Sequence, residues 1–385
     1  MEMDTRDRNG FALPAALLAM VVIGAAVTGG FYAASQENRI SSATAESRSA
    51  FYVAEYGVQE TLATTYLPWY DAIPVAGSQT RSGDYEINGR VVGEYDVAVR
   101  RLGTQLFLIS SVGRLVNSGR GNSAERTVAQ VVRTDIWNMP MNAALHVNGP
   151  LTVTGNAYIT GSDLDSGLCH PDGDAVVSGV VVPDSSQVSV TQADHLVGDP
   201  PVEQDTTMTG TSLLEYGETS FDELAAMATH SFAAGTAPQH PNPVELNGQC
   251  DMSVATNWGD PYDGNVCANY YPIIHIQGDA HFSNGRGQGV LLIEGSLQMT
   301  GNFEYDGIVV VKGGIRSTGN GNHIDGVVMV NNGAVELDTQ SSFTAGSSVL
   351  QFSSCNAQRA MTANIRARPI ATRSWFDVSS VAAGE

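Results

Sequence analysis

An apolar run near the amino terminus sets the strongest constraint on how this chain folds. The stretch GFALPAALLAMVVIGAAV, residues 10–27, begins directly after a short charged segment that contains Arg6 and Arg8. The run continues to about Ala34, and about 24 helical residues rising about 1.5 Å each can cross a bilayer core of about 30 Å. A cleaved secretory signal has a shorter apolar stretch followed by a cleavage site. The sequence therefore favours a membrane-spanning helix whose amino terminus lies in the cytoplasm.

The segment that follows the run predicts a continuation of the same helix. No proline occurs from Ser35 to Leu67, and apolar side chains recur there at intervals of three or four residues, which places them on one helical face. These side chains are Phe51, Ala54, Val58, Leu62 and Tyr66. Pro68 ends the pattern. We expect one helix of about 55 residues over 11–67, apolar in its first half and amphipathic in its second.

These amino-terminal features carry a resemblance to a known family. A charged leader, residues 1–10, ends at Gly10; Phe11 follows it, then the apolar stretch, then AFYVAEYGVQETLA at 50–63. Over residues 1–67 the chain resembles type IV pilins and pseudopilins, and most closely PilX-like minor pilins. The resemblance implies that a prepilin peptidase cuts between Gly10 and Phe11 and methylates the new amino terminus. It also implies that the helix contacts other pilin subunits once the protein leaves the inner membrane.

The assembly segment departs from the family pattern at one position. Most pilins carry a glutamate at the fifth position after the cut, where this chain has Ala15 preceded by Pro14. A carboxylate in lipid is costly unless it is paired, so its absence removes a docking interaction together with a desolvation cost. In the family this absence is typical of subunits at or near the filament tip. Gly29 and Gly30 are either ordinary membrane-helix glycines or a place where the helix loosens in a filament, because interior glycine weakens a helix.

Charge and cysteine content narrow the class of protein further. A net charge of −21 and a pI near 4.6 argue against nucleic acid as a partner, because it would be repelled. The four cysteines, Cys169, Cys250, Cys267 and Cys355, allow three pairings if they are oxidised. Disulfides are favoured if the chain is exported, and a Cys250 to Cys267 bond would close a short loop. Four buried thiols are the alternative.

The rest of the chain is predicted to be mainly β structure in two parts. Residues 68–140 contain four alternating segments separated by turns such as Asn-Gly, which predicts an antiparallel meander covering the amphipathic half of the helix. Residues 141–354 contain a repeat of about 18 to 20 residues that starts at 290, 308 and 327, with similar segments at 145–164 and 273–289. Each repeat suits one rung of a right-handed parallel β-helix with aliphatic side chains inside and Gly or Asn at corners.

Two segments of the second part break the repeat. We expect an insertion at about 190–272, with a helix over 212–232 and the loop between Cys250 and Cys267 as its closing part. Residues 355–385 form an arginine-bearing tail that we expect to dock on the protein itself, with Trp375 as its anchor.

The sequence offers little support for catalysis or a bound cofactor. The acidic side chains of the repeat are scattered, and no acid pair recurs at the rung spacing, as a polysaccharide-cleaving site would require. His275 and His281, with Asp279 between them, lie about 20 Å apart if extended, too far to share one metal ion. Two oxygen-rich turns, 170–175 and 260–265, suit structural calcium or ordinary Asp-Gly turns. We expect no enzyme activity and no cofactor beyond such calcium.

Two functions fit these features. The first is a minor or tip-proximal subunit of a type IV pilus or related secretion filament, which passes from a single-pass inner-membrane form to the cell surface and displays its β-helix for assembly or for adhesion to a surface or glycan. The alternative is a permanently anchored β-helix protein that binds or cleaves envelope polysaccharide.

Overall fold

The chain divides into two compact units, which we describe separately. The computed structural model describes residues 12–116, 124–135, 137–164, 176–262, 264–318, 321–339, 348–371 and 374–378. Unit 1 comprises Met1–Thr64, Ile73–Arg133 and Pro369–Glu385, and unit 2 comprises Thr65–Ala72 and Thr134–Arg368. Gly10, Phe11, Cys169, Arg373 and the turn at 170–175 lie outside the described residues.

One helix, α1 (Ala12–Thr64), runs through 53 residues without a break and confirms the predicted long helix. It ends before Pro68, which lies in the first turn of a short second helix, α2 (Leu67–Asp71), in unit 2. A proline suits that position because its missing amide hydrogen has no intrahelical partner there. Along α1 the side chains are exposed from Leu13 to residue 34, and the buried positions begin further on, at Ala50, Val53, Ala54 and Val58.

The sheet of unit 1 confirms the predicted antiparallel meander. Its strands are β1 (Ser78–Ile87), β2 (Arg90–Arg101), β3 (Leu106–Leu115) and β4 (Glu125–Thr134), and each pairs with the next. Asn88 and Gly89 turn the first hairpin with φ of 53° and 74°, as a two-residue Asn-Gly turn requires. The short strand β23 (Trp375–Asp377) adds to β4.

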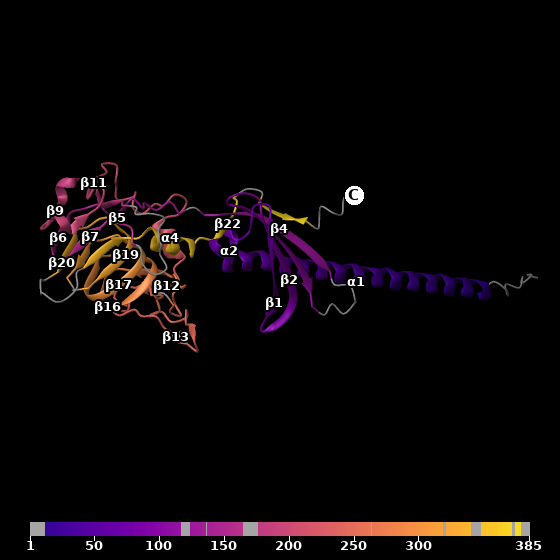
Figure 1. Cartoon of the computed structure of the whole chain (residues 1–385). Coiled ribbons are helices and arrows are strands. Elements are labelled where there is room, and N and C mark those ends of the chain that lie inside the picture. Colours follow the sequence, from indigo (N-terminus) through magenta and orange to yellow (C-terminus); the bar gives the residue numbers. More distant parts are fainter. Residues whose placement is uncertain are drawn as a thin grey trace, which may run out of the picture. The chain divides into compact units, whose positions relative to one another are not determined.

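The second half of α1 lies on one face of this sheet. Its buried side chains Val53, Ala54 and Val58 pack where β2 and β3 place Tyr95, Val97 and Ile109. Figure 1 shows the helix extending well beyond the sheet at its amino-terminal end. The sheet therefore covers only part of the helix.

Unit 2 is built from parallel strands that stack in three rows, the pairing pattern of a β-helix. Short strands and glycine corners bring the chain through each row once per turn. The rows follow in their order of pairing. Row 1 contains β12 (His230–Ala233), β15 (Ile273–Gln277), the ends of β16 (Ala280–Ile293), β17 (Leu297–Val311) and β19 (His323–Val330), then β5 (Ala143–Val147), β8 (Ser178–Val182) and β11 (Val202–Gln204). Row 2 contains the starts of β16 and β17, then β18 (Ile315–Ser317), β20 (Val335–Thr339), β6 (Leu151–Gly155) and β9 (Val188–Val190). Row 3 contains the middles of β16 and β17, the start of β19, then β21 (Val349–Phe352), β7 (Tyr158–Thr160) and β10 (Leu196–Val197).

The stack reproduces the repeat read from the sequence. Val290, Ile308 and Val327, which begin three repeats, pair in register, and Leu145 from the earlier segment pairs with Val328. Glycines occupy one corner: Gly289, Gly307 and Gly326 stack in register with φ of 107°, 131° and 158°. Inside, the Phe282 and Phe303 rings stack 4.5 Å apart.

The rungs do not stack in the order of the chain. The chain enters the stack at β5, in the middle, and winds outward to β11 at one end. It then reaches β12 at the opposite end and winds back through β15, β16 and β17 to β19, which pairs with β5. The connection from β11 to β12, residues 205–229, we call the strap (Figure 1).

The strap differs from the helix expected over 212–232. It contains only the short helix α3 (Phe221–Ala226), so the helix prediction is wrong over 212–220, where the chain forms turns, and after Ala226, where it leads into β12 at His230. Ser220 starts α3 with a capping box to Glu223, and Thr229 and β12 bond to β15 instead of extending the helix. Within the segment expected as an insertion, β10, β11 and β12 all belong to the stack. The segment also contains the 3-10 turn η2 (Ala193–His195) and the hairpin of β13 (Glu245–Leu246) and β14 (Gln249–Cys250). A further 3-10 turn, η1 (Ser185–Gln187), precedes it.

The carboxy-terminal segment contributes to each unit in turn. In unit 2, α4 (Ser354–Thr362) covers row 3, where Asn356 Nδ2 donates to Asp306 at 2.9 Å and Arg359 lies over the Tyr271 ring. The chain then passes through β22 (Ala367–Pro369). In unit 1, Trp375 packs edge-on against Phe51 and is still 42% exposed. Trp375 thus docks on the protein, as expected, without being buried.

Candidate functional site

The uncovered half of α1 is the most unusual surface of the described chain. The helix is long and apolar enough to cross a membrane, and the apolar window is not buried by other parts of the protein. Leu13 is 73% exposed and Phe31 is 79% exposed. No charged side chain occurs from residue 12 to residue 36. A helix that is apolar on all sides requires lipid or other protein around it.

The backbone and polar groups of this segment suit a membrane interior. Thr28 donates its hydroxyl to the Gly24 carbonyl at 2.7 Å, so this hydroxyl has a partner within the helix. Pro14 lies in the first turn of the described helix, where proline is tolerated. A methyl group at Gly29 or Gly30 would meet no atom within 4 Å, and α1 passes through both without a break.

The disulfide between Cys250 and Cys267 is one of the pairings that the sequence left open. It joins Cys250 of β14 to Cys267, which lies in a turn shortly before β15. Asn257 lies beside it and donates to the carbonyls of Val244 and Asp251 at 3.1 and 2.8 Å. Cys355 is also disulfide-bonded. These bonds suit the oxidising surroundings of an exported domain.

His275 and His281, considered above as metal ligands, point to different partners. His275 Nε2 lies 3.2 Å from Glu294 Oε1, and His281 Nε2 lies 3.1 Å from Thr300 Oγ1. The described residues contain no group of three or more histidine, cysteine or acidic side chains able to hold a metal ion. In the turn at 260–265, Asp260 accepts hydrogen bonds from Tyr262 N and Asn265 Nδ2 and pairs with Arg286 at 3.0 Å. Protein donors thus contact both carboxylate oxygens of Asp260, while Asp263 of the same turn lies outside the described residues.

A chain of polar contacts runs through His275 and superficially resembles a hydrolytic relay. Ser231 Oγ lies 3.4 Å from His275 Nδ1, at the limit of hydrogen-bond distance. Glu294 is paired on its other oxygen with Lys312 at 2.7 Å. The Lys312 ammonium lies 4.1 Å from the centre of the Phe221 ring. Burial would lower the pKa of Lys312, but the hydrogen bonds that its ammonium donates to Glu294 and Asp222 outweigh burial and raise that pKa. The arrangement satisfies a buried histidine and holds α3 on the stack.

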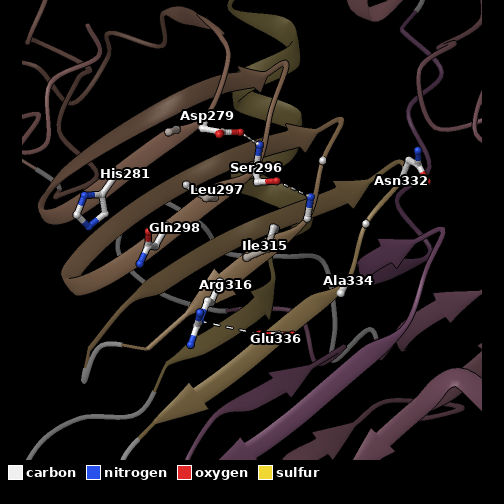
Figure 2. A pocket seen from close by; sticks show the side chains of 14 residues that line it. Asp279, His281, Ser296, Leu297, Gln298, Ile315, Arg316, Asn332, Ala334 and Glu336 are labelled. Carbon is white, nitrogen blue, oxygen red and sulfur yellow. Dashed lines mark hydrogen bonds and ion pairs between the residues drawn. The ribbon is translucent and has the colours of Figure 1, made fainter. Parts of the chain in front are cut away.

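Row 2 carries a groove of about 560 Å³ on unit 2. Figure 2 shows His281, Gln298 and Arg316 projecting from successive strands, with Glu336 on the next strand. Asp279, Ser296 and Asn332 stand along the corner at one edge. The sequence reading missed this groove because its side chains come from four rungs, 17 to 20 residues apart.

Comparisons with known proteins give a likeness among solved structures. No family model and no curated protein matches the chain. Among solved structures, the chain aligns with the crystal structure of the competence-associated pilin ComZ from Thermus thermophilus at a TM-score of 0.24 and 12% sequence identity, over 86% of this chain and 98% of that one. A score this low carries no argument about fold or function, so the proposal below rests on the chain's own elements.

Proposed function

We propose that the protein is a minor or tip-proximal subunit of a type IV pilus or a related secretion filament. In this proposal a prepilin peptidase cuts the chain between Gly10 and Phe11 while α1 lies in the inner membrane. The helix then leaves the lipid, packs among the helices of other pilin subunits and carries unit 2 to the cell surface. The role is structural and adhesive, not enzymatic, and needs no cofactor.

One observation carries the proposal: a single helix is packed on its own sheet over one half and bare over the other. The bare half lacks charge from residue 12 to residue 36, whereas the other half buries Ala50, Val53, Ala54 and Val58. A plain membrane anchor requires only the bare half. A rigid continuation into a folded head serves a filament, because the same helix must exchange lipid for neighbouring helices without changing the head.

Ala15 supports a position near the filament tip. The resemblance implies a glutamate there that pairs with the amino group of a neighbouring subunit during assembly, and alanine makes no such ion pair. A subunit that lacks this interaction gains less by adding to a growing shaft.

The groove of unit 2 supports a second candidate, a protein that stays anchored in the membrane and binds envelope polysaccharide. The two functions differ in their need for processing. Gly10→Leu should block a prepilin peptidase, because the resemblance requires a small residue before the cut. Thr5→Leu adds the same side chain earlier in the leader and serves as the control.

Immunoblots of the inner-membrane fraction and of the fraction sheared from the cell surface provide the test. We expect Gly10→Leu to remain in the membrane at the wild-type level and to vanish from the sheared fraction, while Thr5→Leu occurs in both. Gly10→Leu in the sheared fraction at the wild-type level would contradict the filament proposal. Wild-type protein confined to the membrane would favour the permanently anchored form.

A further inference from the structure

We propose that the groove on row 2 binds an unbranched, neutral glycan that lies along the stack and crosses the strands. The proposal deepens the display role of unit 2 and rests on the proposed function for placing the groove outside the cell. It rests on the register of the strands, the unused hydrogen-bonding groups in the groove and the charge balance there.

The groove presents one polar side chain per rung in a regular row. His281 pairs in register with Gln298, Gln298 with Arg316, and Arg316 with Glu336. Neighbouring strands lie about 4.8 Å apart, so the row extends over about 14 Å. The separation of neighbouring strands, about 4.8 Å, is close to the length of one pyranose unit in an extended chain. Successive sugars would thus meet equivalent positions on successive rungs.

Most of these side chains are exposed and have hydrogen-bonding groups to spare. The side chains of Arg316 and Glu336 are 65% and 55% exposed, and Arg316 Nε lies 3.9 Å from Glu336 Oε2, beyond hydrogen-bond distance. Gln298 makes no side-chain hydrogen bond within the described part of the chain, and His281 bonds only to Thr300. A row that alternates amide, guanidinium and carboxylate offers the donors and acceptors that paired sugar hydroxyls require.

The edge of the groove is fixed before any ligand arrives. Asp279 Oδ1 accepts from Ser296 N at 2.8 Å, and Ser296 Oγ accepts from Gly314 N at 3.2 Å, as Figure 2 shows. A methyl group at Gly313 would lie 2.6 Å from Ser296 Oγ, so this corner excludes larger residues. A preformed edge lowers the entropic cost of binding, and the volume lies in the range of ligand sites, about 300–1,000 Å³.

Charge selects a neutral ligand over an acidic one. The groove sets one arginine, Arg316, against two carboxylates, Asp279 and Glu336, which leaves a slight excess of negative charge. The whole chain has a net charge of −21 and would repel a polyanion. No Phe, Tyr or Trp among the described residues lines the groove, so a glycan would bind through its hydroxyls instead of stacking a ring face.

Isothermal titration of the purified full chain tests this. The protein is placed in lipid nanodiscs free of glycolipid and titrated with cellotetraose, laminaritetraose, chitotetraose and, as the anionic comparison, tetragalacturonate. Arg316→Ala and Gln298→Ala alter the groove. Arg100→Ala removes an exposed arginine from unit 1 and is the matched control.

We expect at least one neutral tetrasaccharide to bind one site, with affinity at least about tenfold weaker in Arg316→Ala, since a hydrogen bond to a charged group contributes about that much. Arg100→Ala should bind as the wild type does. The proposal would be overturned if none of the three neutral sugars bound or if tetragalacturonate bound more tightly than they did. It would also be overturned if both Arg316→Ala and Gln298→Ala kept the affinity of the wild type. The assay requires no filament, so its result is independent of the Gly10→Leu experiment.

Discussion

Gly113 of β3 lies directly against the backbone of Ala54 in α1. A methyl group at Gly113 would lie 2.3 Å from Ala54 N and 2.4 Å from Ala50 O. Both are helix backbone atoms, which cannot move aside as a flexible side chain can. This contact sets how closely the helix and the sheet of unit 1 approach.

We therefore predict that Gly113→Ala destabilises unit 1 by about 1–3 kcal/mol, because the helix must lift from the sheet. Gly103→Ala is the control, since its methyl group would meet only Leu106 Cβ at 3.8 Å. Thermal unfolding and limited proteolysis of the full chain in detergent measure the difference. Equal melting of the two variants would show that the close approach is not required.

His146 gives unit 2 a pH-dependent stability. It is 2% exposed, with Nε2 2.9 Å from Asn142 Oδ1, and burial lowers its pKa to about 4 while the charge of Asp205 raises it slightly. The unfolded chain binds a proton at this histidine near pH 6.5. The stability that neutral His146 allows is therefore fully present above pH 6.5. It is lost as the pH falls from 6.5 toward 4, because the unfolded chain takes up the proton first.

We predict that this loss is on the order of 3 kcal/mol at pH 4 relative to pH 7. His146→Gln should flatten the dependence, and His240→Gln, on the exposed surface, should keep it. The pKa of the Asp306 carboxyl is raised well above its usual value by burial and by Asp325, so this group makes unit 2 less stable as the pH rises. It is present in every variant and does not affect the comparison. Denaturant unfolding at pH 7, 5.5 and 4.5 would refute the assignment if His146→Gln followed the wild type.

The disulfide between Cys250 and Cys267 closes a loop with a sequence separation of 17. Replacing both cysteines by serine should lower the stability of unit 2 by about 3 kcal/mol, because the unfolded chain regains the freedom that the closure removed. Substitution is preferable to a reductant, since Cys355 is also disulfide-bonded. Denaturant unfolding at pH 7 measures the change, and an unaltered midpoint would rule out this stabilising role.

A charge in the bare half of α1 should prevent membrane insertion. Val22 is 59% exposed on this half, and an arginine there costs about 2.5–3.5 kcal/mol at the centre of a bilayer. We expect Val22→Arg to be largely extracted by alkaline carbonate, and Ala45→Arg, beyond the apolar segment, to stay in the membrane pellet. Retention of Val22→Arg at the control level would argue against this span.

Periodicity explains which elements could be predicted from the sequence. The helix, the meander and the in-register starts at Val290, Ile308 and Val327 each follow a local spacing of apolar residues, which the fold preserves. The order of the rungs could not be predicted. Every rung presents the same aliphatic pattern, so nothing local indicates that β19 stacks on β5.

The strap and the groove escaped prediction for related physical reasons. The segment 212–232 has helical composition, but backbone bonds from Thr229 and β12 to β15 outweigh helix propensity after Ala226. The groove has no local signal at all, because His281, Gln298, Arg316 and Glu336 meet only through strand pairing. Sequence spacing identified the rungs but not the surface that they share.

The central claim, assembly into a filament after cleavage, is tested most directly by intact-mass and amino-terminal analysis of the protein sheared from the cell surface. The account predicts a chain that begins at a methylated Phe11 in the sheared fraction. A chain that still begins at Met1 and occurs only in the membrane fraction would contradict it.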